Sequence, residues 1–205
     1  MDYYIDFDNT LYNTPLLTKK MLSTLVESAC AQKKLDATEL KNECNLMFNR
    51  EHIYNIYKLV SYFAQKYELD KSKIVKSIDN EILNGKNFVY DDSISFLSNL
   101  RKNNNKVFLL SYSNDNLNYQ TEKILGSGLT PYFDALFITS KPKYELDINY
   151  SNGIFVDDNP KDLLSLYSKN PKEVIRLKRL SNKYSKIELN IKIAEYDNLK
   201  DIPIN

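Results

Sequence analysis

The chain has 205 residues, of which 42% are hydrophobic and 27% are charged, and its formal net charge is +1. A chain of this length can bury a core, either as one domain or as a core with an inserted subdomain. The near-neutral charge balance gives no general electrostatic reason to expect a nucleic acid or an anionic membrane as partner.

The N-terminus and the cysteines predict the compartment. Tyr3-Tyr4-Ile5 leads directly into acidic residues, without the basic and apolar regions of a signal peptide. Apolar runs of about five residues are far too short to cross a bilayer. Cys30 and Cys44 are too few for a disulfide framework. We therefore expect a cytoplasmic protein with reduced thiols and no membrane contact. The sequence gives no indication of the oligomeric state.

A long helical block follows the first predicted strand, which covers Tyr3–Phe7. Between residues 15 and 83 the apolar residues repeat with the helical period, in four stripes that begin near Leu17, Leu40, Ile53 and Ile74. The stretch Asn84-Gly85-Lys86-Asn87 interrupts the pattern. The sequence thus predicts an all-helical insertion, a cap, at residues 14–88.

Strands and helices alternate in the rest of the chain. Strands are predicted at residues 106–110, 135–138, 153–156 and 173–177, and helices at 93–100, 116–125 and 160–167, the first of them capped by Asp92 or Ser93. A further edge strand or extended arm is predicted from the alternation of apolar residues between Ile187 and Ile193. This order predicts an α/β, Rossmann-like parallel sheet with helices on both faces, formed by residues 1–13 and 89–205.

Acidic residues collect at the carboxyl ends of these strands, where such sheets bind ligands. Asp6 and Asp8 follow the first strand at a spacing that places both on one side of an extended segment. Asp157 and Asp158 follow the strand at residues 153–156. Two groups of carboxylates held together would form an oxygen-rich pocket suited to Mg²⁺.

Two further residues at strand ends have the chemistry to bind a phosphate. Ser111 ends the strand at 106–110 and offers a hydroxyl and a backbone N–H to a phosphoryl oxygen. Lys141, within Ser140-Lys141-Pro142-Lys143, could neutralise the charge of the phosphate and of a carboxylate nucleophile.

Together these motifs resemble the haloacid dehalogenase superfamily of aspartate-nucleophile phosphatases. The four stretches that are similar to its motifs, in chain order, are Asp6-Phe7-Asp8-Asn9-Thr10-Leu11, Val107-Phe108-Leu109-Leu110-Ser111 with Asn114 close behind, Lys141-Pro142, and Ile154-Phe155-Val156-Asp157-Asp158. Their order and spacing are similar to those of the family from residue 1 to about residue 180.

The resemblance implies a role for each carboxylate. Asp6 would attack phosphorus and form an aspartyl-phosphate. Asp8 would protonate the leaving alcohol and later take a proton from the attacking water. Mg²⁺ would be held by Asp6, the backbone carbonyl of Asp8 and the Asp157-Asp158 pair. Asp158 is the favoured direct ligand, because it aligns with the aspartate of the common Gly-Asp version, and Asp157 would act through water or through contacts with the direct ligands.

Ser111, Asn114 and Lys141 would bind the phosphoryl group in the same scheme. The stretch between Lys141 and Asp157 is shorter than in many relatives and leaves no room for a full helix. Lys143 therefore stays open as the alternative lysine.

The resemblance also implies the type of substrate. A dehalogenase needs no acid to release a halide, so an aspartate at position 8 indicates a phosphate ester. A cap between the first two motifs is typical of members that hydrolyse small phosphorylated metabolites. The alternatives are a phosphomutase, a non-catalytic binding protein, and a nucleic-acid end phosphatase. Only the basic segment Arg176–Lys183, otherwise interpreted as a solvated edge, supports the end phosphatase.

Overall fold

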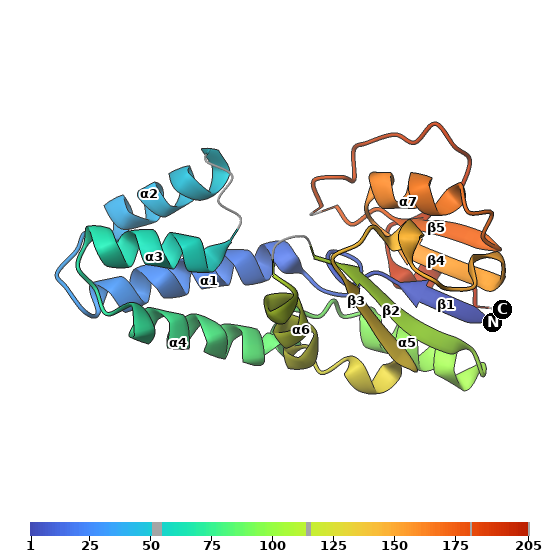
Figure 1. Cartoon of the computed structure of the whole chain (residues 1–205), viewed down its shortest axis with the longest axis horizontal. Coiled ribbons are helices and arrows are strands. Elements are labelled where there is room, and N and C mark those ends of the chain that lie inside the picture. Colours follow the sequence, from blue (N-terminus) through green and yellow to red (C-terminus); the bar gives the residue numbers. More distant parts are fainter. Residues whose placement is uncertain (51–54, 114–115, 181, 205) are drawn as a thin grey trace. The chain divides into compact units, whose positions relative to one another are not determined.

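The computed structural model, which describes residues 1–50, 55–113, 116–180 and 182–204, contains one parallel sheet of six strands (Figure 1). The strand order is β3-β2-β1-β4-β5-β6, and every neighbouring pair is parallel. The strands are β1 (Asp2–Ile5), β2 (Lys106–Tyr112), β3 (Ala135–Thr139), β4 (Gly153–Asp157), β5 (Glu173–Leu177) and β6 (Ala194–Tyr196). The predicted α/β, Rossmann-like fold is confirmed.

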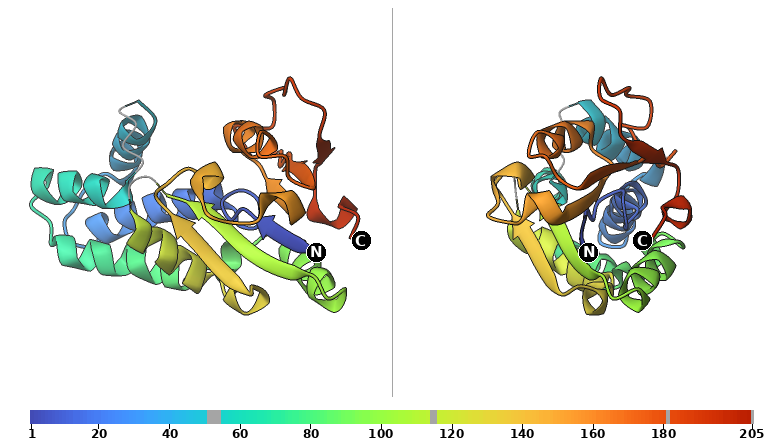
Figure 2. Two further views of the ribbon diagram at one scale, coloured as in Figure 1. Left: turned by 45° about the vertical axis from the view of Figure 1, so that its right-hand side comes forward. Right: turned by 90° about the vertical axis from the view of Figure 1, so that its right-hand side faces the viewer.

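Helices cover both faces of this sheet (Figure 2). They are α5 (Ser93–Lys102), which packs on β2, α6 (Leu117–Gly126), which packs on β3, and α7 (Pro160–Tyr167), which packs on β4 and β5. The chain moves from β1 to β3 in one direction along the sheet and from β4 to β5 in the other. Right-handed crossovers therefore place α5 and α6 on one face and α7 on the opposite face.

The central strands β1, β2 and β4 are mostly apolar because they are largely buried on both faces. On one face the ring of Tyr4 stacks between Phe108 and Phe155, with centroid distances of 4.9 and 4.8 Å. On the other face Ile5 and Leu109 are fully buried. Offset aromatic stacking adds to the stabilisation from buried area. This packing fixes the central strands, and with them the residues that follow.

β1, the first strand of the chain, is the point at which the direction of strand addition reverses: β2 and β3 lie on one side of it, and β4, β5 and β6 lie on the other. β1 pairs with β2 on one side and with β4 on the other, and Ile5 lies in register with both Leu109 and Val156. Asp6 and Asp157, each the next residue along its strand, therefore emerge side by side. In open α/β sheets this reversal point is where ligands bind.

Leu16–Gly85 form a second compact unit, apart from the unit of Met1–Pro15 and Lys86–Asn205 that holds the sheet. Its helices are α1 (Thr14–Cys30), α2 (Ala37–Arg50), α3 (Ile56–Lys66) and α4 (Lys71–Leu83). Asn55 and Asp70 cap α3 and α4 through side-chain bonds to backbone N–H groups. The helical character of the insertion agrees with the sequence pattern, and its action as a cap stays a prediction. No helix in the described parts of the chain combines the length and apolarity needed to span a bilayer.

Of the edge strand and the extended arm predicted for residues 187–193, the edge strand is wrong. That segment is irregular, and the edge strand β6 lies further along, at Ala194–Tyr196. β6 pairs through Ala194 with Ile175 of β5. Alternating apolar residues are also compatible with an extended loop that packs on a surface, so the pattern alone misplaced the strand.

The interpretation of the basic segment as a solvated edge is also wrong for its two arginines. Arg176 is fully buried and donates to Glu195 at 2.8 Å and to the carbonyl of Tyr184 at 2.7 Å. Arg179 is buried and forms a bidentate pair with Asp92 at 2.7 and 2.8 Å. Asp92 precedes α5 but makes no side-chain cap there, because its carboxylate is engaged with Arg179. Both arginines thus hold the C-terminal segment to the core.

Candidate active site

Three buried carboxylates meet at the carboxyl ends of β1 and β4. Asp6, Asp157 and Asp158 are 6%, 2% and 4% exposed, and one oxygen of each lies within 4.8 Å of the others. The backbone N–H of Asp6 donates to the carbonyl of Val156 at 2.9 Å, which extends the pairing of β1 and β4 past Ile5. The sheet itself therefore brings the two acidic motifs together.

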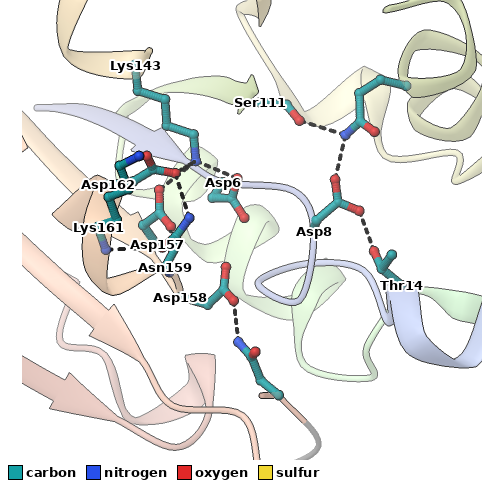
Figure 3. A network of polar contacts seen from close by, with 12 residues as sticks. Asp6, Asp8, Thr14, Ser111, Lys143, Asp157, Asp158, Asn159, Lys161 and Asp162 are labelled. Carbon is teal, nitrogen blue, oxygen red and sulfur yellow. Dashed lines mark hydrogen bonds and ion pairs between the residues drawn. The ribbon is translucent and has the colours of Figure 1, made fainter. Parts of the chain in front are cut away.

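A buried lysine lies among these carboxylates (Figure 3). Nζ of Lys143, which is 2% exposed, donates to Asp6 Oδ1 at 2.7 Å and to Asp157 Oδ2 at 2.6 Å, and lies 3.6 Å from Asp162 Oδ2. Lys141 is exposed, and its backbone N–H donates to Thr139 Oγ1. The lysine that the structure brings to Asp6 is thus Lys143, the alternative, and not Lys141.

A short turn explains this choice between two lysines. The segment between β3 and β4 contains two three-residue 3₁₀ turns, η3 (Lys143–Glu145) and η4 (Tyr150–Asn152), so the prediction that no full helix fits there is confirmed. Pro142 has an extended ψ of 140° and directly precedes η3. The Tyr150 hydroxyl lies 2.8 and 2.9 Å from the carbonyls of Lys143 and Leu146. These bonds hold the turn that directs Lys143 inward.

The electrostatics of the cluster are dominated by burial. Burial raises the pKa of Asp6 well above its usual range, and the charges of Asp157 and Asp158 raise it further against the opposing effect of Lys143. Burial and the neighbouring Asp157 raise the pKa of Asp158 to about 7. For Lys143, burial would lower the pKa, but the charges of Asp157, Asp6 and Asp162 outweigh it and hold the pKa high. The lysine is therefore charged, while the carboxylates repel one another.

This donor set fits a divalent cation with a preference for oxygen ligands. Asp6, Asp157, Asp158 and Asp162 bring four carboxyl groups to one buried cluster, in which Lys143 supplies one positive charge. Burial, and after it the negative charge of the neighbouring carboxylates, raises the pKa values of Asp6 and Asp158. Carboxylates of this kind are the ligands that Mg²⁺ prefers in proteins. Oδ2 of Asp158 also accepts a hydrogen bond from Asn182 Nδ2, which orients this carboxylate.

Asp8 faces away from this cluster, towards α6 (Figure 3). Its carboxylate accepts hydrogen bonds from the hydroxyl of Thr14, from Gln120 Nε2 at 2.6 Å and from Lys123 Nζ at 2.5 Å. Burial alone would raise the pKa of Asp8, but Lys123 and the other donors outweigh it and leave the pKa below its usual range. Asp8 is therefore an ionised carboxylate in this arrangement.

The turn after Asp8 accounts for its direction. Asn9 adopts the left-handed conformation, with φ of 60°, which asparagine tolerates better than most residues. Leu11 and Tyr12 then donate their backbone N–H groups to the carbonyl of Phe7, both at 3.0 Å. This tight turn reverses the chain directly after the acidic motif, so Asp6 and Asp8 do not continue one straight strand.

Ser111 lies where its position at the end of β2 predicted, with 1% of its surface exposed. Its Oγ accepts a hydrogen bond from Gln120 Nε2 at 2.7 Å, so the same amide contacts Ser111 and Asp8. Asn114, predicted to bind the phosphoryl group, lies outside the described residues.

Sequence reasoning did not select the residues that orient the carboxylates, namely Thr14, Gln120, Lys123 and Asn182. The sequence did contain an indication for two of these residues, Gln120 and Lys123. Gln120 and Lys123 fall on the buried face of α6 beside Ile124, where apolar residues are expected. A polar pair on such a face indicates a buried polar partner. Asn182 gave no comparable signal, since the loop that carries it has no regular pattern.

The fold of the chain has counterparts among solved structures. The chain has the fold of the haloacid dehalogenase-like hydrolases, as three solved structures illustrate. A protein from Burkholderia xenovorans classed as a haloacid dehalogenase-like hydrolase matches with a TM-score of 0.72 and 13% identity, over 98% of this chain and 93% of that one. A magnesium-bound protein from Bacillus subtilis classed as a HAD hydrolase matches with a TM-score of 0.64 and 14% identity, over 97% and 95% of the two chains.

A HAD phosphatase from Thermococcus onnurineus has a TM-score of 0.61 and 17% identity to this chain, covering 97% of this chain and 94% of its own. A scan against protein-family models and a search of curated proteins found no match. At these identities the likeness establishes the fold, and the chemistry has to be argued from the site.

Proposed function

We propose that this chain is a Mg²⁺-dependent phosphohydrolase that cleaves a small phosphate monoester through an aspartyl-phosphate on Asp6. The observation that carries the proposal is the buried cluster of Asp6, Asp157, Asp158 and Lys143 at the reversal point of the sheet. A nucleophile, a set of oxygen ligands and a cation lie within reach of one phosphoryl group there.

The contacts of Asp6 suggest how it would react. Its Oδ1 accepts the hydrogen bond from Lys143, which leaves Oδ2 for attack on phosphorus. A bond then forms between Oδ2 and phosphorus as the bond to the leaving oxygen breaks. Lys143 keeps the nucleophile in place, and bound Mg²⁺ would supply the charge that offsets repulsion between Asp6 and the anionic ester.

Asp8 would transfer the protons in both half-reactions. It would give a proton to the leaving alcohol and then take one from the water that attacks the aspartyl-phosphate. Its lowered pKa leaves it ionised, which the second step requires of a proton acceptor. The first step requires that Asp8 enters the reaction protonated. Ser111 and Asn114 are proposed to bind the phosphoryl oxygens.

The residue at position 8 supports a phosphatase over a dehalogenase. Solved structures with this fold include a dehalogenase and a protein from Thermotoga maritima assigned as a β-phosphoglucomutase. Release of a halide needs no proton donor, whereas release of an alcohol does. The end-phosphatase alternative is less well supported, because two of the basic residues that favoured it, Arg176 and Arg179, are buried in ion pairs. A small phosphorylated metabolite remains the proposed substrate.

The test of this function is hydrolysis of 4-nitrophenyl phosphate with and without Mg²⁺, followed by a panel of sugar, nucleoside and cofactor monophosphates. We expect turnover that requires Mg²⁺ and is lost in EDTA. Release of halide from a 2-haloacid, with all phosphate esters left intact, would instead identify a dehalogenase. Phosphate passed to a second position of a sugar, without release, would identify a mutase.

The metal-free protein should lose stability as the pH rises from about 4 to about 7. A carboxyl group whose pKa is higher in the folded state binds protons more tightly there, so unfolding becomes easier as the pH passes from the unfolded to the folded pKa. For Asp158 alone, whose pKa is raised from 3.8 to about 7, the loss is about 4 kcal/mol, and the raised pKa of Asp6 adds to this loss. Urea unfolding in EDTA at several pH values would measure it.

Saturating Mg²⁺ should remove most of this pH dependence, because the ion stabilises the ionised carboxylates. Asp158→Asn is the matched variant and should make the profile in EDTA shallower, with the contribution of Asp6 left in place. A flat profile for the metal-free wild-type protein would contradict the predicted electrostatics of the cluster.

A further inference from the structure

Two side chains of α6 converge on the carboxylate of Asp8. Lys123 Nζ lies 2.5 Å from Oδ1, and Gln120 Nε2 lies 2.6 Å from Oδ2. Gln120 and Lys123 are one helical turn apart, so both project from the same face of α6. Their sequence separation from Asp8 is more than 100 residues, so this contact depends on the fold and not on local geometry.

Packing alone does not account for a lysine at position 123. The side chain is 2% exposed, and its ammonium group lies over the rings of Phe7 and Tyr119, at 5.7 and 5.3 Å from their centroids. Removing a charge from water is costly, and apolar residues of similar volume often stabilise a fold as well as a buried ion pair does. The buried ammonium therefore needs an explanation in terms of the group that it contacts.

The effect of the two residues is to fix the direction of the Asp8 carboxyl group. Oδ1 is bonded to Lys123 and to the hydroxyl of Thr14, while Oδ2 is bonded to Gln120. With both oxygens held by separate donors, rotation of the carboxyl group would break several charge-assisted hydrogen bonds at once. Gln120 also donates to Ser111 Oγ at 2.7 Å, which couples the carboxyl group to the end of β2.

We propose that Lys123 and Gln120 are positioning residues for Asp8, which set where its carboxyl group lies relative to the leaving-group oxygen. The inference rests on the proposed function, because it concerns the proton donor of that reaction. Proton transfer requires heavy atoms within hydrogen-bonding distance, so an unrestrained carboxyl group would protonate the leaving oxygen less often.

The test uses substrates that differ in their need for an acid. The leaving group of 4-nitrophenyl phosphate departs readily without a proton, whereas that of phenyl phosphate depends more on protonation. In Lys123→Met and in Gln120→Met we expect kcat/KM to fall less than about 10-fold for 4-nitrophenyl phosphate and about 100-fold or more for phenyl phosphate. Lys123→Met also removes a charge that favours the ionised form of Asp8, whereas Gln120→Met leaves that charge in place, so Gln120→Met separates orientation from charge. It also keeps the test decisive if Lys123→Met does not fold.

Lys102→Met, at an exposed lysine near the end of α5, is the matched control and should leave both substrates unaffected. Equal losses for the two substrates in a folded variant would overturn the positioning role while leaving the proposed function intact. Absence of turnover by the wild-type protein with Mg²⁺ on either ester would overturn the proposed function, and the positioning role with it.

Discussion

Asp6→Asn is expected to abolish hydrolysis of 4-nitrophenyl phosphate, with a loss of kcat of about 10⁴-fold or more, as removal of a nucleophile usually causes. An amide has no anionic oxygen with which to attack phosphorus, although its shape is that of the carboxylate. The fold should survive, because Asp6 is buried with a raised pKa and a neutral side chain relieves repulsion there. Initial rates with Mg²⁺ and a thermal unfolding curve measure the two effects.

Asp147→Asn is the matched control, since Asp147 is exposed in the segment between β3 and β4. It should keep the rate of the wild-type protein. Turnover of Asp6→Asn at the wild-type rate would rule out Asp6 as the nucleophile, and unfolding of that variant would rule out the electrostatic account of its burial.

Lys143→Met should damage both activity and stability. Removing one partner of a buried ion pair typically costs about 3–5 kcal/mol, because the other partner stays buried without compensation. Lys143 is the ammonium group that contacts Asp6 and Asp157, so the metal-free variant should be destabilised by about this amount at pH 7 and above. The loss should shrink at lower pH, where Asp6 with its raised pKa binds a proton, and on addition of Mg²⁺. Urea unfolding and initial rates are the measurements.

The comparison with Lys141→Met decides between the two lysines of the Lys141-Pro142-Lys143 stretch. Lys141 is exposed, so its replacement should change stability by no more than about 0.5 kcal/mol. Loss of activity in Lys141→Met together with full activity in Lys143→Met would favour the lysine first expected from the sequence.

The site residues that the sequence predicted correctly are those that lie at the ends of regular strands. Asp6, Ser111 and Asp157 each stand at the carboxyl end of a short apolar run, and parallel strands bring such ends to one edge of the sheet. The strand pattern was therefore sufficient to predict that these residues meet. The same logic misplaced the last strand, because alternation between Ile187 and Ile193 does not require pairing.

The features of the site that the sequence could not predict depend on turns and on packing between distant segments. Nothing in Lys141-Pro142-Lys143 says which lysine points inward, since the 3₁₀ turn at Lys143 is held by the distant Tyr150 hydroxyl. The direction of Asp8 likewise depends on the left-handed Asn9 and on donors from α6. Such contacts form only in the folded protein, and local sequence patterns do not predict them.

Trapping the phosphorylated enzyme tests the central claim most directly. The wild-type protein would be mixed with Mg²⁺ and 4-nitrophenyl phosphate, quenched in acid within the first turnover, and reduced with borohydride, which converts an aspartyl-phosphate into homoserine. Peptide mass spectrometry should then find homoserine at position 6, and Asp6→Asn should show none. Modification at another residue, or turnover with no modified peptide in the wild-type protein, would contradict the assignment of Asp6 as the nucleophile.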